Sequence, residues 1–269
     1  MRKQHRTALV VAVCAATTAG GGLLTPANAT PQSSNATERD RPDLSDLSGE
    51  EIAEKASKQL NSSRSLRLKM EAPDLRLNLS LDDKANCSGK VEVPGRGSIR
   101  LIKHGDTIWL RPSTAFWTAQ LGPEHGPAAA REFKDRYIKG TSRDDALGGK
   151  GLAKACDLDA FRAASGALSA PGPHWKRGHT SAVGGHRSVP VTRTQGDIRV
   201  RMHVSAHGKP YPLRLERKAG RDHDKITLSR FNDRVPSGTP PDERTVSVRE
   251  LKRHFGKDRQ EKEPPSESA

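Results

Sequence analysis

A regular alternation of apolar and polar residues constrains the fold of this chain more than any other feature. Every second side chain is apolar in Leu75–Leu81, the period-two pattern of a strand that buries one face. The alternation resumes after a polar turn in Cys87–Val93, which predicts an antiparallel hairpin. Ile99–Lys103 and Thr107–Leu110 repeat the pattern, and Pro112, which lacks a backbone N–H, ends the last strand. We therefore predict a four-stranded meander whose apolar face must be covered by other parts of the chain.

A second strand-rich half is predicted between His174 and Asp233. Apolar and polar residues alternate in Ile198–Val204 and again in Tyr211–Leu215, with shorter strands at Val189–Val191 and Ile226–Leu228. In both halves, arginine is frequent at the polar positions. The outer face of the sheet is therefore predicted to be basic.

Helices are predicted to cover the apolar face. Ser48 and Glu51 form a capping box at the start of a helix whose narrow apolar stripe must pack on the sheet. That stripe comprises Ile52, Ala56 and Leu60. Two short helices are predicted at 116–121 and 127–137, and a third helix at 151–168. Residues 141–150 are expected to form a loop.

The first 29 residues have the order of a secretory signal peptide. Basic residues at 2–6 precede the apolar run Ala8–Val13, and small residues lead to a cleavage site after Ala29. A membrane helix is the alternative, but the apolar run is short and is followed by glycines at 20–22. Cys14 lacks the flanking residues of a lipoprotein signal, so we do not expect lipidation there. The mature protein is predicted to be secreted or held in the cell envelope.

Composition divides the rest of the chain into three parts. Residues 30–47 are rich in Ser, Pro, Asn and Asp without periodicity, which predicts a disordered tether. One folded domain is expected at 48–255. The charged residues 256–269 are predicted to be a disordered tail.

The chain is strongly basic, with 46 Lys and Arg against 32 Asp and Glu and a formal charge of +14. The signal peptide holds three of these cations and no carboxylate, so cleavage leaves +11. A basic exported protein is attracted to anionic wall polymers, membrane headgroups or extracellular nucleic acid. An aromatic content of 4% argues against recognition of single strands by base stacking, so no specific nucleic-acid partner is predicted. A solvated basic face without a ligand is the alternative. The arginines predicted to contact an anionic surface are Arg76, Arg100, Arg199, Arg201 and Arg214.

Export leaves two cysteines, Cys87 and Cys156, in an oxidising compartment, and we predict that they form a disulfide. The bond would join the first hairpin to the third helix. In the chain-entropy model, it would stabilise the fold by about 4 kcal/mol. A thiol nucleophile is the alternative.

No motif for catalysis is present. The sequence has no Gly-x-Ser-x-Gly elbow, no His-Glu-x-x-His zinc motif and no glycine-rich phosphate loop. His174, His179 and His186 lie close together in the sequence, where surface histidines are the simpler interpretation than a metal site. No catalytic residue, metal ligand or cofactor is predicted, and an enzyme is only the third hypothesis.

From Ser48 to Leu251, the chain resembles the LolA-like envelope proteins, especially the actinobacterial branch that includes LppX and LprG-like lipoproteins. The resemblance is carried by Glu50–Leu60, Asn86–Gly89, Gly105–Pro112, Ala115–Trp117, Ala155–Leu158 and Gly208–Glu216. It implies an α+β fold in which helices cover the concave face of a curved antiparallel half-barrel. In this family, the concave face leaves a cavity for acyl chains.

The resemblance implies a non-enzymatic carrier or binder of lipids or lipidated ligands, with a monomer favoured. The residues expected to line the cavity are Leu77, Leu79, Val91, Ile108, Leu110, Trp117, Phe133, Val200, Met202, Leu213 and Leu215. A concave face completely filled by the helices would remove the basis for this hypothesis. The second hypothesis is a basic adhesion protein that binds anionic wall polymer or membrane headgroups through its outer face.

Overall fold

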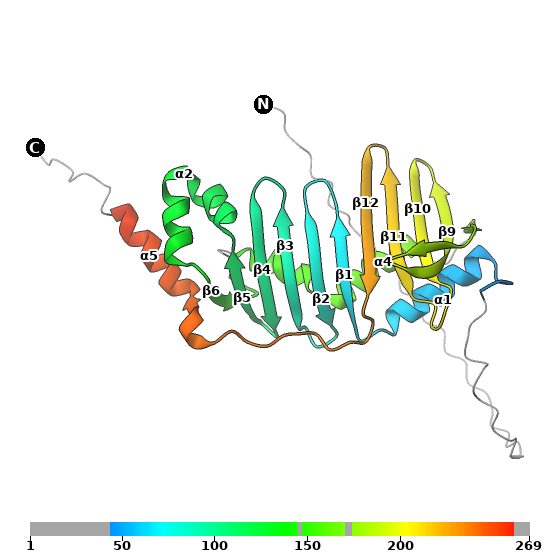
Figure 1. Cartoon of the computed structure of the whole chain (residues 1–269), viewed down its shortest axis with the longest axis horizontal. Helices are drawn as coiled ribbons and strands as arrows, with labels where there is room; N and C mark the ends of the chain where they lie inside the picture. Colours follow the sequence, from blue (N-terminus) through cyan, green and yellow to red (C-terminus); the bar gives the residue numbers. More distant parts are fainter. Residues whose placement is uncertain (1–43, 145–146, 170–173, 261–269) are drawn as a thin grey trace, which may run out of the picture. The chain divides into compact units, whose positions relative to one another are not determined.

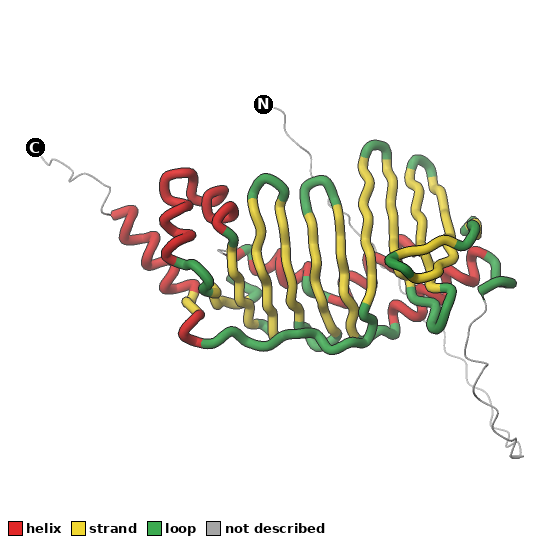
Figure 2. Tube along the Cα trace, viewed as in Figure 1, coloured by secondary structure: helices red, strands yellow, loops and turns green. Residues whose placement is uncertain are grey.

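The computed structural model describes residues 44–144, 147–169 and 174–260. The predicted signal peptide, the tether up to residue 43 and the tail beyond residue 260 lie outside this part of the chain. A single sheet of 13 strands dominates the described residues (Figure 1). The helices lie on one of its faces and at one of its ends (Figure 2).

The strands follow the chain as two antiparallel meanders. Their bounds are β1 (Ser65–Glu71), β2 (Arg76–Asp82), β3 (Cys87–Val93), β4 (Gly97–His104), β5 (Thr107–Pro112), β6 (Tyr137–Thr141), β7 (Lys176–Arg177), β8 (Ser181–Val183), β9 (His186–Gln195), β10 (Ile198–Ser205), β11 (Pro212–Ala219), β12 (Asp222–Ser229) and β13 (Thr245–Ser247). The meanders join where β12 pairs with β1, so the first strand of the first meander lies beside the last strand of the second. At the far edge, β13 pairs in parallel with β6.

The helices are α1 (Gly49–Asn61), α2 (Thr114–Glu132), α3 (Gly149–Ala155), α4 (Leu158–Ser169) and α5 (Val248–Gln260), with a short 3-10 helix, η2 (Asp242–Arg244). Helices α1 and α4 lie behind the sheet in the view of Figure 1, and we call the face that they cover the concave face. Helices α2 and α5 lie beside β5 and β6 at one end of the sheet. The predicted α+β half-barrel with helices on its concave face is confirmed.

Local sequence explains how α1 docks. The predicted capping box is present, because Ser48 Oγ accepts from the Glu51 backbone N–H at 3.2 Å and Glu51 Oε2 accepts from the Ser48 N–H at 2.8 Å. Ile52, Ala56 and Leu60 are buried as predicted. The apolar stripe of α1 therefore packs into the core of the concave face.

Three buried clusters form the core. Two of them lie between the concave face and the helices, one against β1–β5 and β12 and the other against β9–β11. The third lies at the end of the sheet, where Trp117 and Phe133 pack with Phe255 of α5. The sheet is thus covered by two separate groups of helices.

The structure corrects the predicted third helix. The chain breaks at Cys156, which ends α3, and Asp157 Oδ1 then accepts from the Ala160 backbone N–H at 2.9 Å at the start of α4. An N-terminal cap placed in the middle of the apolar pattern splits it into two helices.

The region between β5 and β6 also differs from the prediction. The two predicted short helices merge into α2, which is kinked at Gly122. The φ of Gly122 is 80°, a left-handed backbone conformation that glycine adopts readily. The second helix ends earlier than predicted, since Tyr137 begins strand β6. The four-residue spacing of Phe133 and Tyr137 indicated that the helix continues to Tyr137. Instead, Tyr137–Thr141 pairs with the edge of β5 as a strand.

Ordered structure extends past the predicted domain boundaries at both ends. Leu44 is buried and packs in the core beside α1, four residues before the predicted start. Helix α5 continues to Gln260, into the stretch predicted to be a tail.

Candidate functional site

The deepest level of the concave face is filled. Side chains paired across seven strands form a deep row, which comprises Leu228, Leu68, Leu79, Gly89, Leu101, Leu110 and Ile138. Every leucine and isoleucine of this row is buried. Leu60 of α1 and Leu158 of α4 pack on it, and Phe161 is partly buried against the same cluster. The helices therefore cover the deep row in the described structure.

A second row lies one step nearer the β1–β2 and β3–β4 hairpin tips. It follows adjacent strands β12, β1, β2, β3 and β4, and we call it the apolar row: Ile226, Met70, Leu77, Val91 and Ile99. Its members pack against the core but are only partly buried. Neighbouring strands lie about 4.8 Å apart, so the row extends for about 19 Å. It is a continuous apolar stripe with solvent access.

The predicted cavity residues fall into four groups. Six of them are buried core residues under the helices: Leu79, Ile108, Leu110, Val200, Met202 and Leu215. Leu77 and Val91 belong to the apolar row. Trp117 and Phe133 lie in the separate cluster beside α5. Leu213 lies where the register between β10 and β11 shifts, without a cross-strand partner.

Sequence reasoning missed Met70, Ile99 and Ile226 as members of the partly buried apolar row. Met70 continues the alternation of Leu66 and Leu68, so its orientation could have been inferred from the sequence. Its neighbours could not, because they follow from the pairing of β1 with β12 and β2.

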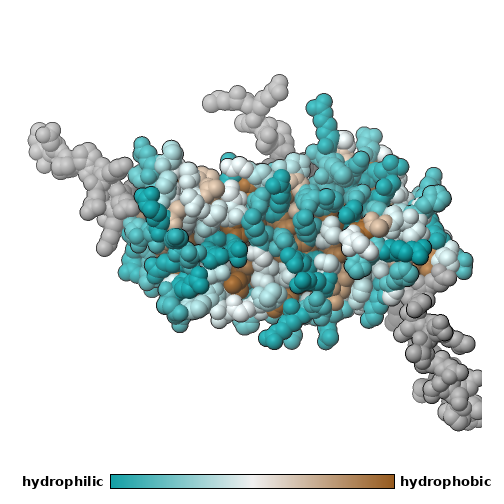
Figure 3. All heavy atoms as spheres, viewed as in Figure 1, coloured by the Kyte–Doolittle hydropathy of each residue, from teal (hydrophilic) through white to brown (hydrophobic). Residues whose placement is uncertain are grey.

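The opposite, convex face carries a row of cations. This basic row follows seven strands in register: Arg214, Thr227, Lys69, Asn78, Lys90, Arg100 and Arg111. Hydrophilic residues predominate on this face in Figure 3. Arginine and lysine were predicted at the outer positions of the strands, and the row shows how they align.

Carboxylates neutralise only part of this face. Glu71 lies between Lys225 and Lys69, and the hydrogen bonds from these two ammonium groups lower the pKa of Glu71 to about 2. Glu92 accepts from Lys90 at 2.7 Å and from Arg76 at 3.0 Å, which likewise lowers the pKa of Glu92. Each carboxylate thus faces two cations, and the face keeps an excess of positive charge.

The convex face is hollowed at two places. A groove of about 670 Å³ runs beside the β1–β2 hairpin, with Lys69, Arg76, Lys225 and other charged residues in its lining. A second groove of about 490 Å³ lies between β3–β5 and α2. Its lining comprises Lys90, Ser98, Arg100, Arg111, Pro112, Ser113, Thr114, Ala130, Phe133, Lys134 and Asp135. Lys90 lines both grooves, so they adjoin.

The five arginines predicted for anionic contact all lie on the convex face. Arg76, Arg100, Arg199 and Arg201 are exposed. Arg214 is half-buried beside Glu216 at 3.7 Å, and its Nε has no hydrogen-bond partner in the described structure. The pattern of alternation therefore correctly assigned these side chains to one face of the sheet. Their contact with a ligand stays a prediction.

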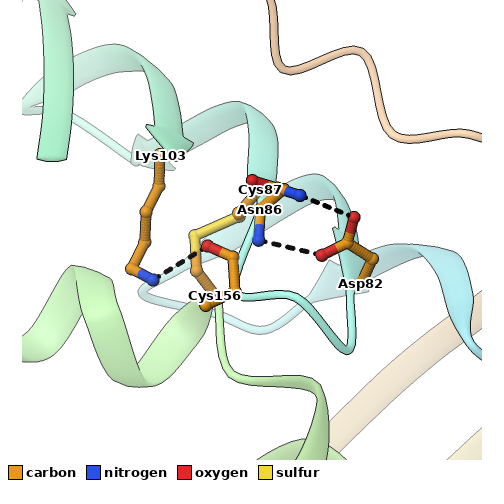
Figure 4. Close-up of a disulfide and its surroundings, with 6 residues drawn as sticks. Asp82, Asn86, Cys87, Lys103 and Cys156 are labelled. Atoms are coloured by element: carbon orange, nitrogen blue, oxygen red, sulfur yellow. Dashed lines mark hydrogen bonds between the residues drawn. A yellow bond between two sulfur atoms is a disulfide. The ribbon is translucent and has the colours of Figure 1, made fainter. Parts of the chain in front are cut away.

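The predicted disulfide is present between Cys87 at the start of β3 and Cys156 at the end of α3, with the Cα atoms 5.5 Å apart (Figure 4). Beside it, the buried Lys103 donates from Nζ to the Ala85 carbonyl at 2.9 Å. Burial lowers the pKa of Lys103, against the opposing effect of nearby aspartates. Asp82 accepts from the Asn86 backbone N–H at 2.9 Å and fixes the β2–β3 turn. This end of the concave face is therefore rigidly linked to the helices.

His203 is the residue that comes nearest to a catalytic arrangement. It is buried, and its Nδ1 lies 3.3 Å from Ser181 Oγ and 3.5 Å from Ser188 Oγ. Ser188 Oγ, however, donates to the Ser181 carbonyl at 3.2 Å, so its proton is already engaged. Burial lowers the pKa of His203. We interpret this cluster as a buried hydrogen-bond network that attaches β8 to the sheet.

Within residues 44–144, 147–169 and 174–260, no group of His, Cys, Asp or Glu is arranged to hold a metal ion. In the same part of the chain, none of the helices has the length and apolarity needed to span a membrane.

No family model matches the sequence, and neither does any curated protein. Among solved structures, the chain is similar to LprF from Mycobacterium bovis, with 13% identity over 71% of this chain and 96% of LprF and a TM-score of 0.49. It is also similar to the lipoprotein LppX from Mycobacterium tuberculosis, with 9% identity over 71% of this chain and 98% of LppX and a TM-score of 0.46. LppX is a protein of the branch that the sequence resembles.

Proposed function

We propose that this chain is an exported, non-enzymatic protein that binds a lipid or another amphipathic ligand along the apolar row of the concave face. The observation that supports this proposal is the solvent access of five apolar side chains aligned on adjacent strands. Fully burying one such side chain is worth about 1.5–3 kcal/mol. Since each side chain is already partly buried, covering the exposed remainder of the whole row would contribute at most about 5 kcal/mol. Because the deep row is filled, the ligand would lie along the apolar row rather than beneath the helices.

Mass spectrometry of organic extracts from natively purified mature protein tests this proposal. The wild type should carry an amphipathic molecule, and Leu77→Glu should lose it because a carboxylate would interrupt the apolar row. Asn78→Glu is the matched control, since Asn78 lies on the same strand but on the convex face, where its Oδ1 accepts from Arg67 Nε at 2.9 Å. Equal amounts of ligand in the wild type and both variants would contradict the assignment to the apolar row.

A second candidate function is adhesion to anionic envelope polymer or membrane headgroups through the convex face. The observation that favours it is the alignment of cations along the basic row, together with the excess of positive charge that this face keeps. Such an interaction should weaken steeply with salt, because exposed charges are screened beyond about 10 Å at 0.1 M. Retention of the folded protein on an anionic polymer at low salt should therefore disappear at moderate salt. Absent or salt-insensitive retention would exclude this function.

A further inference from the structure

We infer that the groove between β3–β5 and α2 is a specific site for a phosphate-bearing ligand, held by Lys90, Arg100, Arg111 and Lys134. The inference rests on the second candidate function. It deepens that function by replacing a diffusely basic face with one defined site and one ligand chemistry.

Like charges face one another beside this groove, and carboxylates compensate them only in part, since Glu92 pairs with Lys90 and Asp135 with Arg111. Lys90 lies directly opposite Arg100 on the neighbouring strand, and Arg100 lies directly opposite Arg111. The Cβ atoms of such pairs are about 4.5–5.5 Å apart, and like charges in these positions destabilise a sheet. Elsewhere on the basic row, an uncharged residue separates the cations, as Asn78 does between Lys69 and Lys90. Three successive cations in register repel one another, and a bound anion would offset this repulsion.

The carboxylates of the neighbouring row stop short of the groove. Lys225, Glu71, Arg76 and Glu92 alternate in charge across four strands. The next position, opposite Glu92 on β4, is held by Ser98 rather than by a charged residue. The alternation therefore stops at the edge of the groove, and Arg100 has no ion-pair partner in the described part of the chain.

The shape and chemistry of the groove also suit an anion. Its volume of about 490 Å³ is within the usual range for small-ligand sites, which is about 300–1,000 Å³. Ser98, Ser113 and Thr114 place hydroxyl groups in its lining. Ser113 Oγ accepts from the Ser98 and Phe116 backbone N–H groups at 3.0 and 3.2 Å, so its orientation is fixed. Hydroxyl donors beside cations suit an oxyanion.

The residue types favour phosphate among the oxyanions. A guanidinium group is a planar fork that binds two phosphate oxygens at once, and lysine adds compact charge. Two arginines and two lysines match a group with several negative charges, such as a phosphate monoester or consecutive phosphodiesters. The one carboxylate in the lining, Asp135, is exposed and lies 3.3 Å from Arg111. A ligand oxygen could replace it at little cost.

Titration of the full mature protein with tripolyphosphate, and flotation with phosphatidylglycerol or phosphatidylcholine vesicles, test the inference. Arg100→Gln removes the cation without breaking a described ion pair and should weaken binding about tenfold. Lys218→Gln is the matched control, because Lys218 is also an exposed cation on the convex face, lies opposite another cation, Arg199, and is not among the residues predicted to contact an anion. This control should bind within about twofold of the wild type. Arg100→Lys, which keeps the charge but loses the fork, should be intermediate.

The outcomes separate the site from the broader function. Binding to tripolyphosphate supports a soluble phosphate ligand, whereas binding only to phosphatidylglycerol vesicles supports a lipid headgroup as the source of the phosphate. Equal losses in Arg100→Gln and Lys218→Gln would overturn the site while leaving a diffusely basic face. Failure of the wild type to bind any anionic probe, anionic polymer included, would overturn both.

Discussion

Cys87 and Cys156 are covalently joined, with their Cα atoms 5.5 Å apart although 69 positions separate them in the sequence. The bond holds the junction of α3 and α4 against the first hairpin. It thereby connects the helical cover directly to the concave face that carries the apolar row.

Substituting both cysteines by serine should therefore destabilise the protein. Loss of a native bridge of this kind costs about 2–5 kcal/mol, chiefly because the unfolded chain regains freedom. Urea unfolding of the double variant and of the oxidised wild type measures the difference. The reduced wild type should behave like the double variant, and an unchanged midpoint in both would show that the bond does not stabilise the fold.

Gly97→Ala should destabilise the protein more than Gly95→Ala, although both glycines have positive φ angles, of 89° and 75°. At Gly95 an added Cβ meets no atom within 4 Å, so the expected cost is the backbone strain of about 1–2 kcal/mol. At Gly97 it would lie 2.4 Å from the Phe116 backbone nitrogen, where β4 passes α2. Thermal unfolding should rank the variants accordingly, and equal melting temperatures would contradict this close approach.

The stability of the protein should fall as the pH falls below about 6.5, partly because of His203. Burial lowers the pKa of His203 in the folded state, so between that value and the ordinary one the unfolded chain binds more protons. The stability from the neutral imidazole is thus present above the ordinary pKa and is lost as acid is added. Unfolding free energies of His203→Gln across this range should decline less steeply than those of the wild type. Parallel curves would contradict the prediction.

Arg100→Gln should raise stability slightly at low salt, by about 0.2–1 kcal/mol, because it removes a cation that faces Lys90 and Arg111. The gain should shrink at high salt, where these charges are screened. Melting temperatures at the two ionic strengths measure it. A loss of stability at low salt would mean that Arg100 serves the fold, and would remove the electrostatic argument for the phosphate site.

The sequence alone determined which side chains share a face. Successive residues of a strand point to opposite sides, so the alternation in Leu75–Leu81 put Leu77 and Leu79 on one side and Arg76 on the other. The same reasoning put the five predicted arginines on the outer face. The predicted export to an oxidising compartment and the presence of two cysteines after cleavage were sufficient to predict the bond between Cys87 and Cys156. Each of these inferences depends on local spacing or composition, which the sequence displays directly.

Only the tertiary structure decided which residues of a face are neighbours and which remain exposed. Leu79 and Leu77 look alike in the sequence, yet the helices cover Leu79 and leave Leu77 partly accessible. The neighbours Ile226 and Met70 come from opposite ends of the domain and meet because β12 pairs with β1. Likewise, Lys90, Arg100 and Arg111 form one group only in the observed register. Register and helix placement are set by packing across the whole chain, so no local pattern could reveal them.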